Sequence, residues 1–140
     1  MMNANDTYVT IEYKSGAYIG KAIDVSPPRT LVEIMAVLRH PMQGDLHHPY
    51  EPDVPMFHER RASSHREKVW VPTASLKTYE GDVPAYDESL RRAWEQHVQL
   101  VNRMIEEGEA SALANRHPGL TLWAEKALVH LRRLESDYWG

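Results

Sequence analysis

The spacing of the apolar residues changes once along the chain, from every second residue in the first half to every third or fourth in the second. Over residues 8–13 the side chains alternate as they do in a strand with one buried face. From residue 87 onward the apolar side chains recur with the period of an amphipathic helix. These side chains are Leu90, Trp94, Val98, Val101 and Ile105. The two periods predict an α+β protein with its strands first and its helices last.

The first half is expected to form short strands separated by turns. Gly16 can adopt the positive φ of a tight turn, and Pro27 and Pro28 cannot donate hydrogen bonds to a sheet. The expected strands are residues 8–13, 17–25, 30–38, 56–71 and 76–79, with a bulge at Gly20 and a bend near Ser63. Short strands with one long excursion are typical of a small, strongly bent barrel. We therefore expect an N-terminal SH3-like β-barrel over residues 1–80, with a long loop at residues 41–55.

The second half is expected to form a C-terminal α-helical hairpin over residues 81–140. Asp82 or Asp87 can cap the start of the first helix, and Gly108 is suited to its end. Pro118 then begins a second helix with an apolar stripe of its own. Two amphipathic helices joined by a short connection pack antiparallel, so Trp94 and Trp123 are expected to be buried.

The segment between the two apolar patterns, residues 38–68, is rich in histidine and proline. It holds five of the eight histidines and four of the nine prolines of the chain. So polar a segment, broken so often by proline, is not expected to form core, and loops on a rigid scaffold often carry binding function. We expect residues 41–55 and the adjacent strand surface to bind another protein. The candidate protein-binding residues are His40, Gln43, Asp45, His47, His58 and Arg60.

Charge and composition exclude several classes of protein. The net charge of -4 argues against a nucleic-acid binder, which normally presents a basic surface. The chain has no cysteine, so disulfides, thiolate metal sites and a lipidated cysteine are excluded. The first ten residues lack the features of a signal peptide, and no run approaches the roughly 18 apolar residues of a membrane span. We expect a cytoplasmic protein without direct membrane insertion.

The histidines of this segment raise an alternative, which is a metal-binding module or a metal-dependent hydrolase. His47 and His48, with Asp45 and Asp53 nearby, supply nitrogen and oxygen donors for zinc. The spacing is weak support, because neighbouring histidines on an extended chain point to opposite faces and no HExxH motif is present. Histidines that donate to backbone carbonyls within the loop explain the pattern equally well.

The run His58-Glu59-Arg60-Arg61 raises the question of acid–base catalysis. On a strand, His58 and Arg60 face one way while Glu59 faces the other, which separates the acid from the base. The chain also lacks a GxSxG elbow, a phosphate-binding glycine loop and a dinucleotide-binding fingerprint. We therefore predict no enzymatic activity, no catalytic residues and no cofactor.

Several stretches of the sequence resemble one bacterial family. The most distinctive is HPMQGDLH at residues 40–47. The other matching stretches are YKSGAYIG at residues 13–20, FHER at 57–60, PAYDESL at 84–90 and LESDY at 134–138. Together they resemble the kinase-associated protein B family of spore-forming bacilli over nearly the whole chain.

This resemblance implies an SH3-like β-domain followed by helices, with no enzymatic activity or cofactor. It implies an accessory protein that binds and modulates, in the activating direction, a sensor histidine kinase of the sporulation phosphorelay. Some members are described as lipoproteins, whereas this chain has no cysteine to carry a lipid. Membrane association is then expected only through the partner kinase. Whether the protein forms a homo-oligomer stays open.

Overall fold

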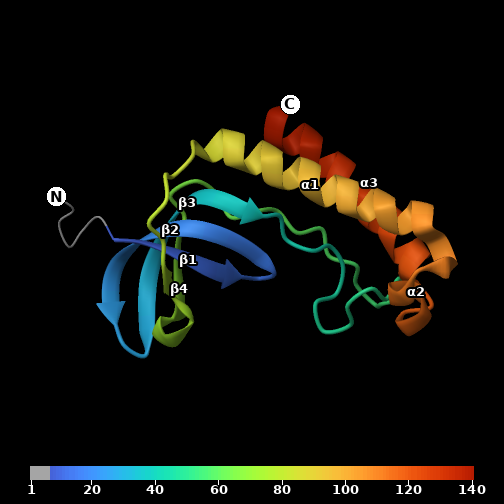
Figure 1. Ribbon diagram of the computed structural model, residues 1–140, viewed down its shortest axis with the longest axis horizontal. Helices are drawn as coiled ribbons and strands as arrows, with labels where there is room; N and C mark the ends of the chain where they lie inside the picture. The colour runs from blue at the N-terminus through green and yellow to red at the C-terminus, as the bar shows by residue number, and fades with distance from the viewer. Residues whose placement is uncertain (1–6) are drawn as a thin grey trace. The chain divides into compact units, whose positions relative to one another are not determined.

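A computed structural model describes residues 7–140 as a five-stranded antiparallel sheet followed by helices (Figure 1). The strands are β1 (Tyr8–Tyr13), β2 (Gly16–Ser26), β3 (Arg29–Arg39), β4 (Lys68–Pro72) and β5 (Lys77–Thr78). The long helices are α1 (Tyr86–Glu107) and α3 (Leu120–Trp139), and the short elements are η2 (Thr73–Ser75), η3 (Gly108–Ala110) and α2 (Ala112–Arg116). The predicted α+β class is confirmed.

The strand order is β4-β3-β2-β1-β5, so the last strand returns to pair with the first, as expected of an SH3-like sheet. In β3, Thr30, Val32, Ile34 and Ala36 are buried, and the residues between them are partly exposed. This alternation places one face of the sheet in the core, as the period of two predicted. The register between β2 and β3 shifts beside Gly20, which confirms the predicted irregularity.

Gly20 is required at this bend by close packing. A Cβ atom built on Gly20 would lie 2.2 Å from Cγ1 of Val32 and 3.0 Å from the carbonyl oxygen of Glu33. The two strands therefore cross more closely than any side chain on residue 20 would allow.

The prediction of a fourth strand over residues 56–71 is wrong for most of its length. Only Lys68–Pro72 pairs with β3, and residues 56–67 have no strand assignment. Some of their backbone groups bond to side chains instead, as at Ser63, whose N–H donates to the hydroxyl of Tyr18 at 3.0 Å. The carbonyl oxygen of Ser63 accepts from the hydroxyl of Tyr86 at the start of α1. Two tyrosines thus satisfy both backbone groups of a buried residue that lies outside the sheet.

The chain divides into two compact units, and the division does not follow the order of the sequence. The sheet unit runs to Pro41 and includes Ala62–Ala93, and the helical unit consists of Met42–Arg61 and Trp94–Gly140. Residues 42–61 of the excursion between β3 and β4 therefore belong with the helices, and the division falls inside α1. The predicted domain boundary at residue 80 stays a prediction.

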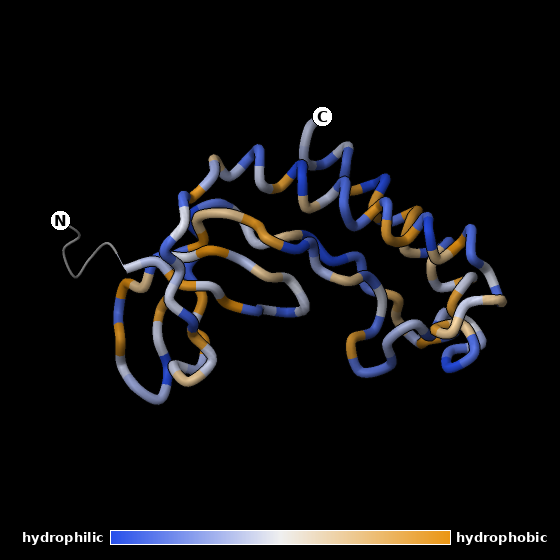
Figure 2. The backbone as a smooth tube through the Cα atoms, viewed as in Figure 1, coloured by the Kyte–Doolittle hydropathy of each residue, from blue (hydrophilic) through white to orange (hydrophobic). Residues whose placement is uncertain are grey.

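The core of the helical unit lies between the C-terminal part of α1 and α3, which run side by side (Figure 1). Hydrophobic positions recur along both helices between hydrophilic ones (Figure 2). Trp94 and Trp123 are 4% and 1% exposed, which confirms their predicted burial. The indole Nε1 of Trp94 donates to the carbonyl oxygen of Leu131 at 2.9 Å, so its one polar group is satisfied inside the core. None of the helices in residues 7–140 is long and apolar enough to span a bilayer.

Replacing Tyr18 with phenylalanine tests the contact at Ser63. Tyr18→Phe leaves the buried N–H of Ser63 without its acceptor, so we expect the free energy of unfolding to fall by about 1 to 3 kcal/mol near neutral pH. Urea titration measures this loss. Tyr13→Phe, which removes a partly exposed phenol of β1, serves as the control and should change stability little.

The stability difference between wild type and Tyr18→Phe should also depend on pH. Burial raises the pKa of Tyr18 above its ordinary value of 10.0, because the ionised phenol is disfavoured in the core. The folded state therefore favours the neutral phenol. This contribution to stability is complete below the pKa that Tyr18 has in the unfolded chain, and it is lost as pH rises through the higher pKa that Tyr18 has in the folded protein. We expect the stability advantage of the wild type over Tyr18→Phe to shrink as pH rises above the ordinary tyrosine pKa of 10.0. A constant difference over this range would contradict the interpretation.

Candidate protein-binding site

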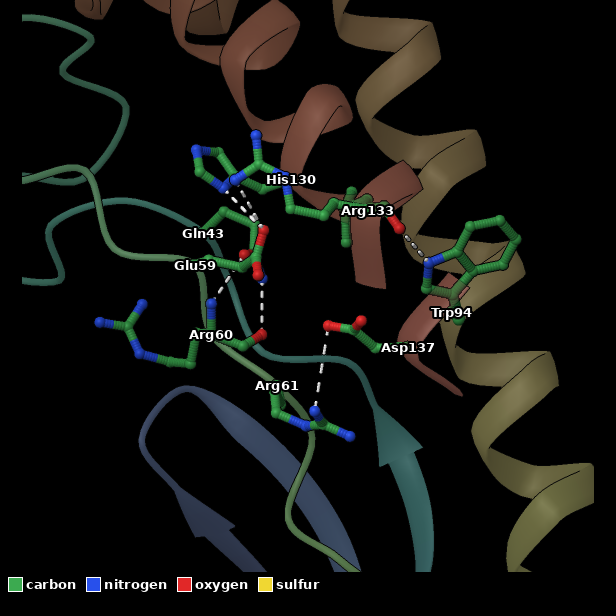
Figure 3. A network of polar contacts seen from close by, with 9 residues as sticks. Gln43, Glu59, Arg60, Arg61, Trp94, His130, Arg133 and Asp137 are labelled. Atoms are coloured by element: carbon green, nitrogen blue, oxygen red, sulfur yellow. Dashed lines mark hydrogen bonds and ion pairs between the residues drawn. The ribbon is translucent and has the colours of Figure 1, made fainter. Parts of the chain in front are cut away.

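We call Met42–Arg61, the part of the excursion that belongs to the helical unit, the arm. The side chain of Gln43 holds the base of the arm together through hydrogen bonds. Gln43 is 2% exposed, and its amide nitrogen Nε2 donates to the carbonyl oxygen of Arg60 at 2.8 Å (Figure 3). Its oxygen Oε1 accepts from the N–H of Arg60, also at 2.8 Å. The amide thus bonds to both backbone groups of one residue, as a neighbouring strand would. This pairing replaces the sheet ladder that the arm lacks.

The guanidinium of Arg60 adds a second set of bonds at the same place. Its Nη1 donates to the carbonyl oxygen of Met42 at 2.7 Å and to that of Gly44 at 3.2 Å. The N–H of Gly44 in turn donates to the carbonyl oxygen of His58 at 2.9 Å. Partial burial lowers the pKa of the Arg60 guanidinium, and the nearby carboxylate of Asp45 opposes that effect. Arg60 therefore bonds the two ends of the arm to each other.

Gly44 allows this junction to pack against the helical core. Its φ is +94°, a conformation that favours glycine. A Cβ atom there would lie 3.0 Å from Nε1 of Trp123 and 3.1 Å from Cε2 of Phe57. The turn at Gly44 is therefore packed inward, against the ring of a buried tryptophan.

Alternate residues of the arm meet one face of α3. An extended chain directs residues 57, 59 and 61 to the same side, and residues 130, 133 and 137 share a helical face. Phe57 stacks on His130 with 5.3 Å between ring centroids. Glu59 lies 2.9 Å from His130 Nδ1 and 3.5 Å from Arg133 Nη1, and Arg61 lies 4.0 Å from Asp137 (Figure 3). Every second residue of the extended arm thus meets every third or fourth residue of α3 along this contact.

The far end of the arm, at residues 50–52, also contacts α3. The ammonium of Lys126, one turn before His130 on α3, donates to the carbonyl oxygen of Pro52 at 2.8 Å. The ring of Tyr50 packs edge-on against Trp123 with 5.1 Å between centroids. The arm is therefore fixed at its base and at its far end.

The turn after Gly44 is organised by the carboxylate of Asp45. One carboxylate oxygen accepts from the N–H of His47 at 2.9 Å, and the other lies 3.1 Å from Nδ1 of His48. These bonds lower the pKa of Asp45, and the backbone donor of His47 makes the largest contribution. Asp45 thereby fixes the backbone of the turn and leaves the ring of His47 exposed.

Two of the six candidate residues are buried, contrary to the expectation of an exposed recognition face at these positions. His40 is 0% exposed at the end of the sheet unit, and its Nδ1 lies 2.9 Å from the carbonyl oxygen of Pro41. Gln43 is buried because its amide completes the pairing with Arg60. The side chains of His40 and Gln43 therefore contact the backbone of this protein, at Pro41 and Arg60.

The other four candidates divide into two roles. Asp45 and Arg60 are half-buried and bond to backbone groups within the arm. His47 and His58 are exposed. Exposed apolar side chains accompany them, since Leu46 is 38% and Met56 62% exposed. We call Leu46, His47, Met56 and His58 the exposed arm residues.

Sequence reasoning missed the partners of the arm on α3, which are Lys126, His130, Arg133 and Asp137. A signal was available, because these residues recur every three or four positions and so share one polar face of the second helix. Among residues 7–140, no three histidine, aspartate or glutamate side chains are grouped so that they could hold a metal ion. The metal-binding alternative therefore has no ligand set in the described part of the chain.

Comparisons with known proteins agree with one another. Residues 13–139 match the family described as kinase associated protein B. A relative from Bacillus subtilis (strain 168), called kinase-associated lipoprotein B, is 42% identical over 128 residues, which are 91% of this chain and 88% of the relative. A crystal structure of kinase-associated protein B from Bacillus cereus is 30% identical, with a TM-score of 0.68, and the match covers 99% of this chain and 98% of that one.

Replacing Gln43 with leucine tests the role of its amide. Gln43→Leu keeps the size of the side chain but leaves the N–H and carbonyl oxygen of Arg60 without the amide, at a cost of about 2 to 4 kcal/mol. We expect amide hydrogen exchange at Arg60 to accelerate and proteolysis within the arm to increase. Gln99→Leu, the same change at an exposed position of α1, is the matched control. Unchanged exchange at Arg60 would show that the amide does not stabilise the arm.

Proposed function

The chain belongs to the kinase-associated protein B family, and from this we propose that it is a non-enzymatic accessory protein that binds and activates a sensor histidine kinase of the sporulation phosphorelay. The name of the family supports a kinase partner. The identity of that kinase and the direction of the effect belong to the proposal.

The fixed geometry of the arm is the observation that carries this proposal. The arm is hydrogen-bonded at its base through Gln43 and Arg60 and at its far end through Lys126. A segment already ordered before binding loses little conformational entropy when a partner docks on it. Methionine is enriched at protein interfaces, and Met56 is 62% exposed on the arm. These properties suit a docking surface for another protein.

The exposed arm residues then form the proposed contact with the kinase. Imidazoles both donate and accept hydrogen bonds, and the apolar side chains of Leu46 and Met56 add area that docking removes from water. Gln43, Asp45 and Arg60 contribute by fixing the backbone from which these side chains extend.

Regulation would follow from unequal affinity for two states of the kinase. A protein that binds both states equally shifts nothing, whereas a preference of about 1.4 kcal/mol for the active state shifts the equilibrium about tenfold. In this proposal the arm docks better on the conformation that autophosphorylates. No group of this chain takes part in phosphoryl transfer.

Membrane association forms part of the same proposal. The Bacillus subtilis relative is called a lipoprotein, whereas the 140 residues of this chain include no cysteine. We place the protein at the membrane through its contact with the kinase.

The test compares kinase binding and autophosphorylation with the wild-type protein and with His47→Ala/His58→Ala. We expect wild type to bind and to raise autophosphorylation, and the double variant to bind about five- to thirtyfold more weakly. Arg103→Ala/Glu106→Ala, at exposed positions of α1, is the matched control and should behave as wild type.

Two negative results have different meanings. Wild-type protein that neither binds nor stimulates the kinase would refute the accessory role. Binding of the double variant with wild-type affinity would refute the docking surface on the arm and leave the accessory role standing.

A further inference from the structure

The sheet unit contains a groove that the proposed function does not use. Its volume is about 480 Å³, and it lies beside the start of α1. The residues that matter for its chemistry are Tyr8, Met35, His65, Pro84, Tyr86 and Asp87. They come from β1, from β3, from the segment before β4 and from the first turn of α1 with the residues preceding it.

Two aromatic rings form a rigid part of the wall. The rings of His65 and Tyr86 stack with 5.2 Å between centroids and 16° between planes. The hydroxyl of Tyr86 donates to the carbonyl oxygen of Ser63, which fixes the orientation of the ring. The groove is therefore shaped before any ligand arrives.

The two strands contribute an apolar and an aromatic side chain to the lining, Met35 and Tyr8. Met35 lies between the buried Ile34 and Ala36 of β3, so it faces away from the core. Tyr8 lies on the same side of the sheet, because it pairs with Lys21, which in turn pairs with Glu33 of β3. Flat rings beside Pro84 suit ligand groups that are apolar, flat and short of hydrogen-bond donors.

Among the described residues that line the groove, Asp87 supplies the one carboxylate. It is exposed in the first turn of α1. A carboxylate there repels phosphate and nucleic acid and attracts a guanidinium or ammonium group.

We propose that this groove binds an extended, proline-containing peptide segment of a partner protein, with prolyl rings on the aromatic wall and a basic side chain beside Asp87. Polyproline II peptides have no internal hydrogen bonds and lose little entropy on docking, and aromatic-lined grooves recognise them. Their proline residues carry no N–H, so they need no backbone acceptor in the wall that the two rings form. This inference goes beyond the proposed function, because it concerns a surface of the other unit and does not require the partner to be a kinase.

The experiment titrates ¹⁵N-labelled full-length protein with synthetic peptides and follows amide chemical shifts. The probes are a hexaproline peptide ending in arginine, the same peptide ending in glutamate, and a glycine–serine peptide of equal length ending in arginine. We expect amide shifts at Tyr8, Met35, His65, Val83 and residues 85–87 with the arginine-ended hexaproline, and weaker binding of the other two.

Variants of the protein separate the contribution of charge from that of the rings. Asp87→Asn should weaken binding of the arginine-ended peptide about two- to fivefold. It should not weaken binding of the glutamate-ended peptide. Glu88→Gln removes a carboxylate from the same helical turn outside the groove, and it should bind as wild type. His65→Ala should weaken both hexaproline peptides, because it removes the stacked ring.

Three outcomes would overturn the inference. They are absence of shifts at millimolar peptide, shifts confined to residues outside the groove, and equal binding of the glycine–serine peptide. Normal folding of each variant is checked by its amide spectrum, so loss of binding is read only from folded protein.

Discussion

A long chain segment without regular secondary structure keeps one conformation only if its buried backbone groups have hydrogen-bond partners. In the arm, the side-chain amide of Gln43 supplies these partners. One side chain donates to the carbonyl oxygen of Arg60 and accepts from its N–H. The guanidinium of Arg60 then bonds two carbonyl oxygens on the opposite side of the junction. The contacts with α3 depend on this junction, because it sets where residues 57–61 begin and which way they face.

The sheet unit solves the same problem with different side chains. Ser63 is buried outside any strand, and the hydroxyl groups of Tyr18 and Tyr86 bond to its two backbone groups. In both units, a polar side chain from a distant part of the sequence replaces a neighbouring strand. The ordered loops of this protein are therefore stabilised by a few specific long-range hydrogen bonds in addition to packing.

The regular elements could be predicted because their patterns are local. Alternation marks β1 and β3, the helical period marks α1 and α3, and the burial of Trp94 and Trp123 follows from that period. Residues 56–67 could not be assigned in this way, because an extended chain has the same local pattern whether its partner is a strand or a helix. The partners that decide the matter, such as His130 for Glu59, lie 71 positions away in the sequence.

The candidate protein-binding site stays a prediction, and the structure shows only which of its side chains are exposed. The sequence identified the segment and the exposed histidines His47 and His58, but it could not show that Gln43 and His40 are buried. Polar residues among prolines are usually solvated, and a glutamine enters a core only when both ends of its amide are satisfied. Which acceptor and donor satisfy Gln43 is a property of the folded chain, since Arg60 follows 17 residues later.

The match between an extended segment and a helix has a consequence for how this part of the chain can evolve. Residues 57, 59 and 61 contact α3 because consecutive side chains of an extended backbone point to opposite sides. Loss or gain of a single codon here would exchange the two sides, turning charged groups from the helix toward water and their neighbours toward the helix. Descendants of this sequence should accordingly preserve the length of this segment even where its side chains are replaced.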